Sequence, residues 1–213
     1  MPMQKLLLQI LEGTGVAVQI FLLTLLFSLP LGLLVAFGRM SKRSYISKPV
    51  KVYQLIMRGT PLMLQLMLVF FGPYYLFKVT MNRFAATIIA FVINYAAYFA
   101  EIYRSGIESM PQGQYEAAKV LGFSKSKTFF RIILPQVIKR ILPPMGNEFM
   151  TLIKDTALAY AIGVGELFRV AQTATSRTSS ILPLVVAGVV YFVLNAIVEK
   201  GFVVAEKKLD YYR

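Results

Sequence analysis

Four long stretches of this chain contain no charged residue, and they constrain its fold more than any other feature. They span residues 13–38, 59–77, 84–100 and 178–198. A helix needs about 20 apolar residues to cross the hydrocarbon core of a membrane, and each stretch meets or nearly meets that length. Only 15% of the residues are charged, against about 25% in a typical soluble domain. We therefore expect an all-α membrane protein.

A fifth hydrophobic region covers residues 132–154, but it contains four charged side chains and the sequence Pro-Pro-Met-Gly at 143–146. Because proline removes an intrahelical hydrogen bond, we expect this span to be broken there. Residues 156–165 are apolar but too few to cross, which suits a re-entrant or partly buried segment. The prediction is a single transmembrane domain, residues 1–213, of about five helices.

The cationic residues predict the orientation of those helices. Residues 38–59, 103–141 and the tail from 200 onward hold 17 of the 23 Lys and Arg residues. Cytoplasmic loops of membrane proteins are enriched in Lys and Arg, so we expect the N-terminus outside and the C-terminus in the cytoplasm. A sixth span would put the four cations of the tail outside. Because the charges flank apolar runs, the net charge of +13 does not indicate nucleic-acid binding.

Several kinds of chemistry are excluded by composition. The chain has no His and no Cys, which removes the usual zinc ligands, thiol nucleophiles and Ser-His-Asp triads. It also lacks the Gly-x4-Gly-Lys-Ser/Thr loop that cradles nucleotide phosphates. We therefore expect no enzyme activity and no cofactor bound by this chain.

The most informative segment is a predicted cytoplasmic loop, about residues 104–131. It contains Glu-Ala-Ala at 116–118, then Gly122, and, after nine intervening residues, Ile-Ile-Leu-Pro at 132–135. Pro111 is suited to open a short helix and Gly122 to stop it. Ala117, Val120 and Leu121 would share one face at helical spacing. Such a helix offers a surface that another protein can approach closely, or it rests on lipid headgroups.

This pattern resembles the cytoplasmic-loop signature of permease subunits in ATP-binding-cassette importers. Further segments resemble polar amino-acid permeases of that class: Arg-Gly-Thr-Pro at 58–61, Tyr-Phe-Ala-Glu-Ile-Tyr-Arg-Ser-Gly-Ile at 98–107, and Asn-Glu-Phe and Lys-Asp-Thr at 147–149 and 154–156. The resemblance implies that the loop 111–124 is a coupling helix seated in a groove of a separate ATPase. The residues expected at that contact are Glu116, Ala117, Ala118, Leu121 and Gly122.

The resemblance also implies a set of partners. Two cytoplasmic ATPase subunits would bind ATP and Mg, and a second permease subunit, identical or homologous, would complete the pathway. An extracytoplasmic binding protein would deliver an amino acid, polar or cationic. The expected location is the inner membrane of a bacterial cell, with several spans.

Charged residues at membrane depth are costly and are therefore candidate functional groups. We expect Glu148 to hold the ammonium or a cationic side chain of the substrate, with Asn94, Gln65 and Thr151 as hydrogen-bond partners. Glu101 is a second acidic candidate.

Simple structural pairing is the alternative for each of these charges. Glu148 would then pair with a nearby cation, and Glu101 would pair near the cytoplasmic edge. Lys154 and Asp155 would form an interfacial pair. The cations available to Glu148 are Lys139, Arg140 and Lys154, and those available to Glu101 are Arg58 and Arg104.

An autonomous ion-coupled carrier or channel is the alternative function, with Glu101 and Glu148 as a proton or sodium relay. The chain shows no internal repeat of the kind common in secondary transporters, and this alternative leaves the loop signature unexplained. A membrane enzyme would lack His, Cys and a close pair of acids.

Overall fold

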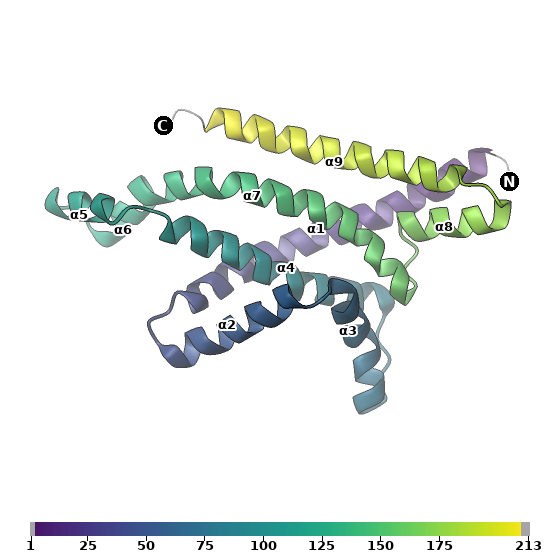
Figure 1. Ribbon diagram of the computed structural model, residues 1–213, viewed down its shortest axis with the longest axis horizontal. Coiled ribbons are helices and arrows are strands. Elements are labelled where there is room, and N and C mark those ends of the chain that lie inside the picture. Colours follow the sequence, from purple (N-terminus) through teal and green to yellow (C-terminus); the bar gives the residue numbers. More distant parts are fainter. Residues whose placement is uncertain (1–2, 210–213) are drawn as a thin grey trace.

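The computed structural model describes residues 3–209, and this part of the chain is a bundle of helices without a β-strand (Figure 1). In chain order the elements are α1 (Met3–Arg39), α2 (Ser44–Gly59), α3 (Leu62–Phe77), α4 (Arg83–Glu108), α5 (Gln112–Val120), α6 (Lys125–Thr128), the π-helical segment η1 (Phe129–Ile133), α7 (Leu134–Asp155), the 3₁₀ helix η2 (Thr156–Ile162), α8 (Leu167–Thr178) and α9 (Leu182–Lys208).

Helix α4 lies at the centre of the bundle. Its large side chains Phe91, Tyr95 and Phe99 are at most 2% exposed. Helix α1 packs directly along it at Gly32, where an added Cβ would lie 2.9 Å from the Cβ of Phe99 and 3.1 Å from the carbonyl oxygen of Ala96. Small residues let helices approach closely in membranes, so Gly32 fixes the α1–α4 contact.

Three of the described helices, α1, α4 and α9, are long and apolar enough to cross a membrane, and α2 with α3 forms a fourth, bent candidate. Helix α7 is more polar, but its 22 residues extend about 33 Å, enough for a hydrocarbon core of about 30 Å. These elements agree with the predicted all-α membrane fold.

A sharp bend separates α2 from α3, whose axes differ by 108°, so this pair is either a broken span or a re-entrant loop. Thr60 is extended, at φ −124° and ψ 150°, as expected of a residue before proline. The carbonyl oxygens of Met57 and Thr60 accept hydrogen bonds from Gln65 Nε2 at 3.0 and 3.1 Å. Asn94 Nδ2 donates to Met57 O and to Gln65 Oε1. These amides satisfy backbone groups that have no water available in a bilayer.

The predicted break at residues 143–146 is wrong, because α7 continues through both prolines from Leu134 to Asp155. The packing of the residues that follow the prolines explains why the helix continues. An added Cβ on Gly146 would lie 3.0 Å from Phe202 of α9, and the rings of Phe149 and Phe202 are 5.0 Å apart. Close contact with α9 therefore offsets the hydrogen bonds that the prolines remove.

The segment after α7 is partly buried, as predicted. Residues Thr156, Ala159 and Ile162 of η2 face the core, and η2 ends at Gly163, whose φ of +86° favours glycine. Helix α8 then starts at a different angle and packs against α1 and α9.

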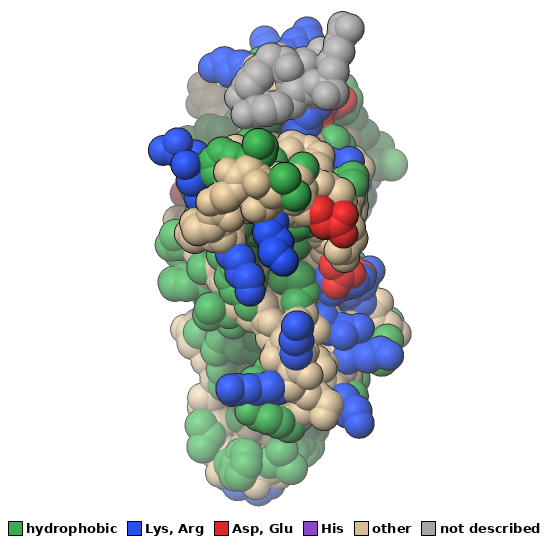
Figure 2. Space-filling model, turned by 90° about the vertical axis from the view of Figure 1, so that its left-hand side faces the viewer, with side chains coloured by type: hydrophobic (Ala, Val, Ile, Leu, Met, Phe, Trp, Pro, Cys, Tyr) green, Lys and Arg blue, Asp and Glu red, His purple; other side chains and the backbone are tan. Residues whose placement is uncertain are grey.

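The two ends of the bundle differ in character. Helices α5 and α6, the α1–α2 turn and the last turn of α9 lie at one end, whereas the start of α1 and α8 lie at the other (Figure 1). The two ends of the described chain therefore lie at opposite ends of the bundle. Figure 2 shows that many Lys and Arg side chains, and few Asp or Glu, cover the end with α5 and α6.

Candidate functional site

Two carboxylates of α7 face the central helix of the bundle. Glu148 and Asp155 are seven residues apart, so they lie on the same face of α7, about 10 Å apart along its axis. Both side chains are half-buried. The described ion pairs include neither of them, so pairing of Glu148 with Lys154 or Arg140, or of Asp155 with Lys154, is not seen among residues 3–209.

Two tyrosines of α4 complete this cluster. The hydroxyl of Tyr95 donates a hydrogen bond to Asp155 Oδ2 at 2.8 Å. The rings of Tyr95 and Tyr98 have centroids 6.1 Å apart, and Tyr98 is close enough to Glu148 to feel its charge. We call Tyr95, Tyr98, Glu148 and Asp155 the acidic-aromatic site. Carboxylates and aromatic faces both attract cations, so this site suits an ammonium or guanidinium group.

The predicted hydrogen-bond partners of Glu148 lie elsewhere. Asn94 and Gln65 are 3% and 8% exposed and bind the backbone of the α2–α3 bend. Thr151 donates to the carbonyl oxygen of Asn147 at 2.9 Å and lines a different groove with Lys154 and α9. The structure therefore groups Glu148 with Asp155 and the tyrosines, and not with these three residues. The seven-residue spacing of the two acids was the sequence signal for this grouping.

Glu101 belongs to an ion-pair cluster, as the structural alternative predicted. Its carboxylate accepts from Arg104 Nε at 3.1 Å and lies 3.8 Å from Arg58 Nη1. Arg58 also lies over the ring of Tyr98, 5.6 Å from its centroid. Glu101 is thus occupied by cations of the protein and does not offer a free carboxylate to a substrate.

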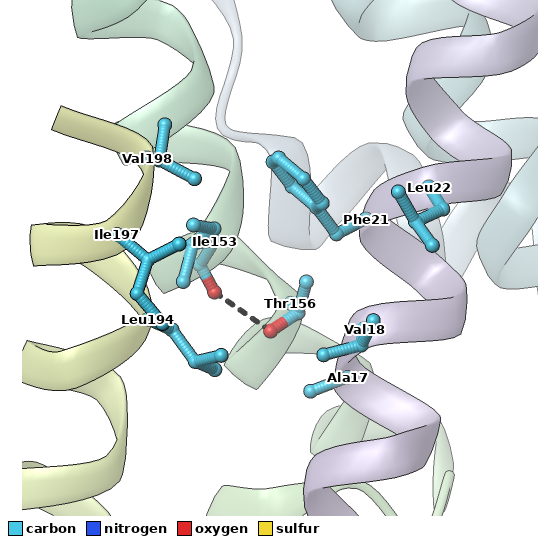
Figure 3. Close-up of a pocket in the computed structure, with 9 residues that line it drawn as sticks. All are labelled: Ala17, Val18, Phe21, Leu22, Ile153, Thr156, Leu194, Ile197 and Val198. Atoms are coloured by element: carbon cyan, nitrogen blue, oxygen red, sulfur yellow. Dashed lines mark hydrogen bonds between the residues drawn. The ribbon is translucent and has the colours of Figure 1, made fainter. Parts of the chain in front are cut away.

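The largely apolar cavity between α1, α7 and α9 is not suited to an amino acid (Figure 3). The hydroxyl of Thr156 is the polar side-chain group that Figure 3 draws there, and it already donates to Ile153 O at 2.7 Å. The remaining lining side chains are aliphatic or aromatic, from Ala17, Val18, Phe21, Leu22, Ile153, Leu194, Ile197 and Val198. This cavity offers no partner for an ammonium or a carboxylate.

The predicted short helix in the loop is present as α5. Gly122 has φ +75°, and Phe123 N donates to Ala118 O while Gly122 N donates to Lys119 O, both at 3.0 Å. These are the bonds of a helix stop with a left-handed residue. The structure therefore confirms both the helix and its end.

Four of the five residues predicted at the ATPase contact are exposed at the surface of α5 and its C-terminal end. Glu116, Ala117, Leu121 and Gly122 are exposed, and Val120 and Leu121 are 87% and 73% exposed. Ala118 is different, because it is 2% exposed and faces the chain's own interior. Val120 and Leu121 thus form an exposed apolar pair at the C-terminal end of this short helix, outside the candidate spans.

A pair of glutamines, which the sequence did not indicate, attaches α5 to α7. Gln114 Nε2 donates to Gln136 Oε1 at 2.9 Å, and Gln136 Nε2 donates to Gln114 Oε1 at 2.8 Å. Arg140 Nη1 donates to Ser109 O at 2.7 Å. Movement of α5 would therefore pull directly on the helix that carries Glu148.

A buried carboxylate holds α8 against α9. Glu166 is 0% exposed and accepts hydrogen bonds from Phe168 N and Arg169 N, each at 2.7 Å, and from the hydroxyl of Tyr191 at 2.9 Å. Burial raises the pKa of the Glu166 carboxyl, and these three bonds oppose the rise.

Among residues 3–209 no group of three or more acidic side chains is placed to hold a metal ion.

Comparison with known proteins gives a consistent result. Residues 28–210 match the family described as "Binding-protein-dependent transport system inner membrane component". The chain is 39% identical over 202 residues to the L-cystine transport system permease protein TcyB of Bacillus subtilis (strain 168), covering 94% of this chain and 86% of that protein. It is 37% identical over 201 residues to the arginine transport system permease protein ArtQ of the same organism, covering 94% and 92%. A putative glutamine transport system permease protein, GlnP of Rickettsia typhi, is 33% identical over 204 residues, covering 95% and 94%.

Solved structures show the same relationship. The crystal structure of an amino acid ABC transporter with histidines superimposes with a TM-score of 0.89 at 33% identity, covering 97% of this chain and 96% of that chain. An inward-facing structure of the MetNI methionine ABC transporter superimposes with a TM-score of 0.75 at 16% identity, covering 98% of both chains. The latter similarity concerns the fold alone.

Proposed function

Because this chain belongs to the family of binding-protein-dependent transport system inner membrane components, we propose that it forms half of the membrane pathway of an amino-acid importer. The chain is a multi-pass permease of the amino-acid ATP-binding-cassette transporter class, as its relatives are. Its partner in the pathway is a second permease subunit, and the complex lies in the inner membrane of a bacterial cell.

A separate ATPase supplies the energy. The sequence has no phosphate-binding loop, and α5 presents Val120 and Leu121 to the outside of the bundle. The ATPase binds ATP and Mg and holds α5 in a surface groove. The hydrogen-bonded pair Gln114–Gln136 transmits the movement of α5 to α7. The many Lys and Arg side chains around α5 (Figure 2) support a cytoplasmic position for this end, with the N-terminus outside.

The transported solute is an amino acid whose cationic group contacts the acidic-aromatic site. The single observation that carries this is the pair Glu148 and Asp155, which face α4 without an ion-pair partner among the described residues. The relatives transport cystine, arginine or glutamine according to their names, and each of these has an α-ammonium. A binding protein on the outer side delivers the solute, and ATP binding shifts the bundle between two conformations.

The test is ATP-driven uptake by the assembled transporter in proteoliposomes. Glu148→Gln should lower the uptake rate of the preferred amino acid about tenfold or more, since a hydrogen bond to a charged group contributes about 1.5–3 kcal/mol. Glu199→Gln makes the same chemical change at an exposed position of α9 and should leave uptake within about twofold of wild type, as expected of a surface change.

Two results would contradict the proposal. Equal uptake by Glu148→Gln and Glu199→Gln would remove the acidic-aromatic site from the pathway. Uptake that continues without any ATPase subunit, driven by a proton or sodium gradient, would identify an autonomous carrier.

A further inference from the structure

Two arginines meet at the end of the bundle opposite α5. Arg83 is the first residue of α4, and Arg169 lies in the first turn of α8. Both reach Gly163, the residue that ends η2. The guanidinium carbons of Arg83 and Arg169 are 3.4 and 3.5 Å from the point where a Cβ of Gly163 would stand. The two carbons are therefore at most about 7 Å apart.

Neither arginine forms an ion pair within the described residues, although the buried carboxylate of Glu166 lies close enough to attract Arg169. Nη1 of Arg169 is buried without a hydrogen-bond acceptor. Glu166 is nearby in sequence, but its oxygens accept from two backbone N–H groups and Tyr191. Glu12 lines the neighbouring groove with Arg169 and forms no ion pair. Two like charges this close repel each other, and an anion between them would remove that cost.

The arginine pair lies in an open groove that is lined by both polar and aromatic side chains. Gln172 and Thr173 of α8 supply polar groups, and Tyr160 of η2 and Phe70 and Phe71 of α3 supply aromatic surface. One wall of this groove is η2, which begins directly after Asp155. The groove is therefore connected to Asp155 through η2, and it lies on the side of α7 away from α5.

We propose that Arg83 and Arg169 bind the carboxylate of the amino acid where it enters the pathway, before its cationic group reaches Glu148 and Asp155. This rests on the proposed function. Guanidinium groups bind carboxylates in a two-pronged geometry, and two guanidinium carbons at most about 7 Å apart are close enough for one carboxylate to contact both groups. Every α-amino acid carries this carboxylate, so the arginine pair recognises the class of solute, and the deeper acids recognise its cationic groups.

Thr173 allows a direct test, because it is exposed in the groove and the chain has no cysteine. A Thr173→Cys variant in the complete transporter, reconstituted in nanodiscs, is labelled with a maleimide, and the labelling rate is measured. L-arginine and L-glutamine are the probes, each compared with the matching amide that lacks the carboxylate. The acids should slow labelling severalfold and the amides should not.

Variants of the arginine pair separate binding from structure. Arg83→Gln and Arg169→Gln in the Thr173→Cys background should each raise the half-protecting concentration of the amino acid about tenfold. A change of this size corresponds to the free energy of one charge-assisted hydrogen bond. Arg83→Lys should keep part of the protection. Arg177→Gln, two turns further along α8, is the matched control and should leave protection unchanged. If Arg169→Gln does not assemble, Arg83→Gln at the exposed start of α4 decides the result.

Three outcomes overturn the proposal. Equal protection by acid and amide would show that the carboxylate is not recognised, and unchanged protection in both Gln variants would make the arginine pair a structural feature. Protection by the ligand-free binding protein alone would assign the arginine pair to docking of that protein. ATP-driven uptake in the same background reports separately on the proposed function, because a transporter that imports amino acids without carboxylate-dependent protection contradicts only the arginine site.

Discussion

At the scale of single residues, the environment of each acidic side chain decides what it can do. Glu101 is neutralised by two arginines, Glu166 is held by three donors, and Glu148 and Asp155 face tyrosines with no ion-pair partner among the described residues. The sequence singled out Glu148 as a charged residue at membrane depth, which is a candidate functional group. Asn94 and Gln65 were predicted as hydrogen-bond partners of Glu148, because nothing in the sequence shows that their amides donate instead to carbonyl groups of the α2–α3 bend.

Glu166 leads to a prediction about stability and pH. Glu166→Ala leaves three buried donors unpaired and should lower the free energy of unfolding by about 1–3 kcal/mol, measured as a lower melting temperature in detergent. Glu166→Gln keeps the carbonyl acceptor and should be milder. Because burial raises the pKa of Glu166 in the folded protein, the folded state holds its proton more tightly than the unfolded state. The stability of wild type relative to Glu166→Gln should therefore fall as the pH rises from about 4.3, the ordinary value for Glu, through the raised pKa. A difference that grows with pH would contradict this description of Glu166.

At the scale of helices, much was predictable from hydrophobic length and turn chemistry. The charge-free stretches correspond to α1, α3, α4 and α9, and Pro111 and Gly122 bracket α5 as expected. The position of the sharp bend was not predictable, because Pro61 and Pro143–Pro144 give the same local signal. Packing decides between them: Phe202 supports the helix beyond Pro143–Pro144, whereas Gln65 and Asn94 stabilise the open turn at Pro61.

The glutamine pair leads to a prediction about coupling between helices. Gln114→Leu should break both side-chain hydrogen bonds to Gln136 and leave the oxygen of this half-buried amide without its partner, while its Nε2 still donates to Ile132 O; the expected cost is about 1 kcal/mol. The expected result is less solute imported per ATP hydrolysed, with ATPase activity largely retained. Gln136→Leu should have the same effect. The loss of import per ATP in the double variant should be smaller than the sum of the two single losses, since the two residues act as one unit. Strict additivity of the two changes would show that the glutamines do not work together.

At the scale of the whole molecule, one end of the bundle is basic and presents α5, and the opposite end presents the arginine pair. Between them lie the carboxylates of α7. An amino acid that enters at the arginine pair first meets a partner for its carboxylate and then meets partners for its ammonium group. The acidic-aromatic site, where the ammonium group binds, is connected to α5 through α7. The sequence predicted the two ends from charge alone, but not the arginine pair, because Arg83 and Arg169 are 86 residues apart in the chain and meet only through η2.

Protection of α5 by the ATPase tests most directly whether this chain is the membrane half of an ATP-driven importer. A single cysteine replaces Leu121 and, as a control at the same end, Ser44, and inside-out vesicles are labelled with an impermeant maleimide with and without the cognate ATPase subunit. We expect Leu121→Cys to be labelled from the cytoplasmic side and to become at least about tenfold less reactive when the ATPase binds, as a residue buried in an interface core should, while Ser44→Cys stays reactive. Labelling of Leu121→Cys at the same rate whether or not the ATPase is bound would contradict a coupling role for α5.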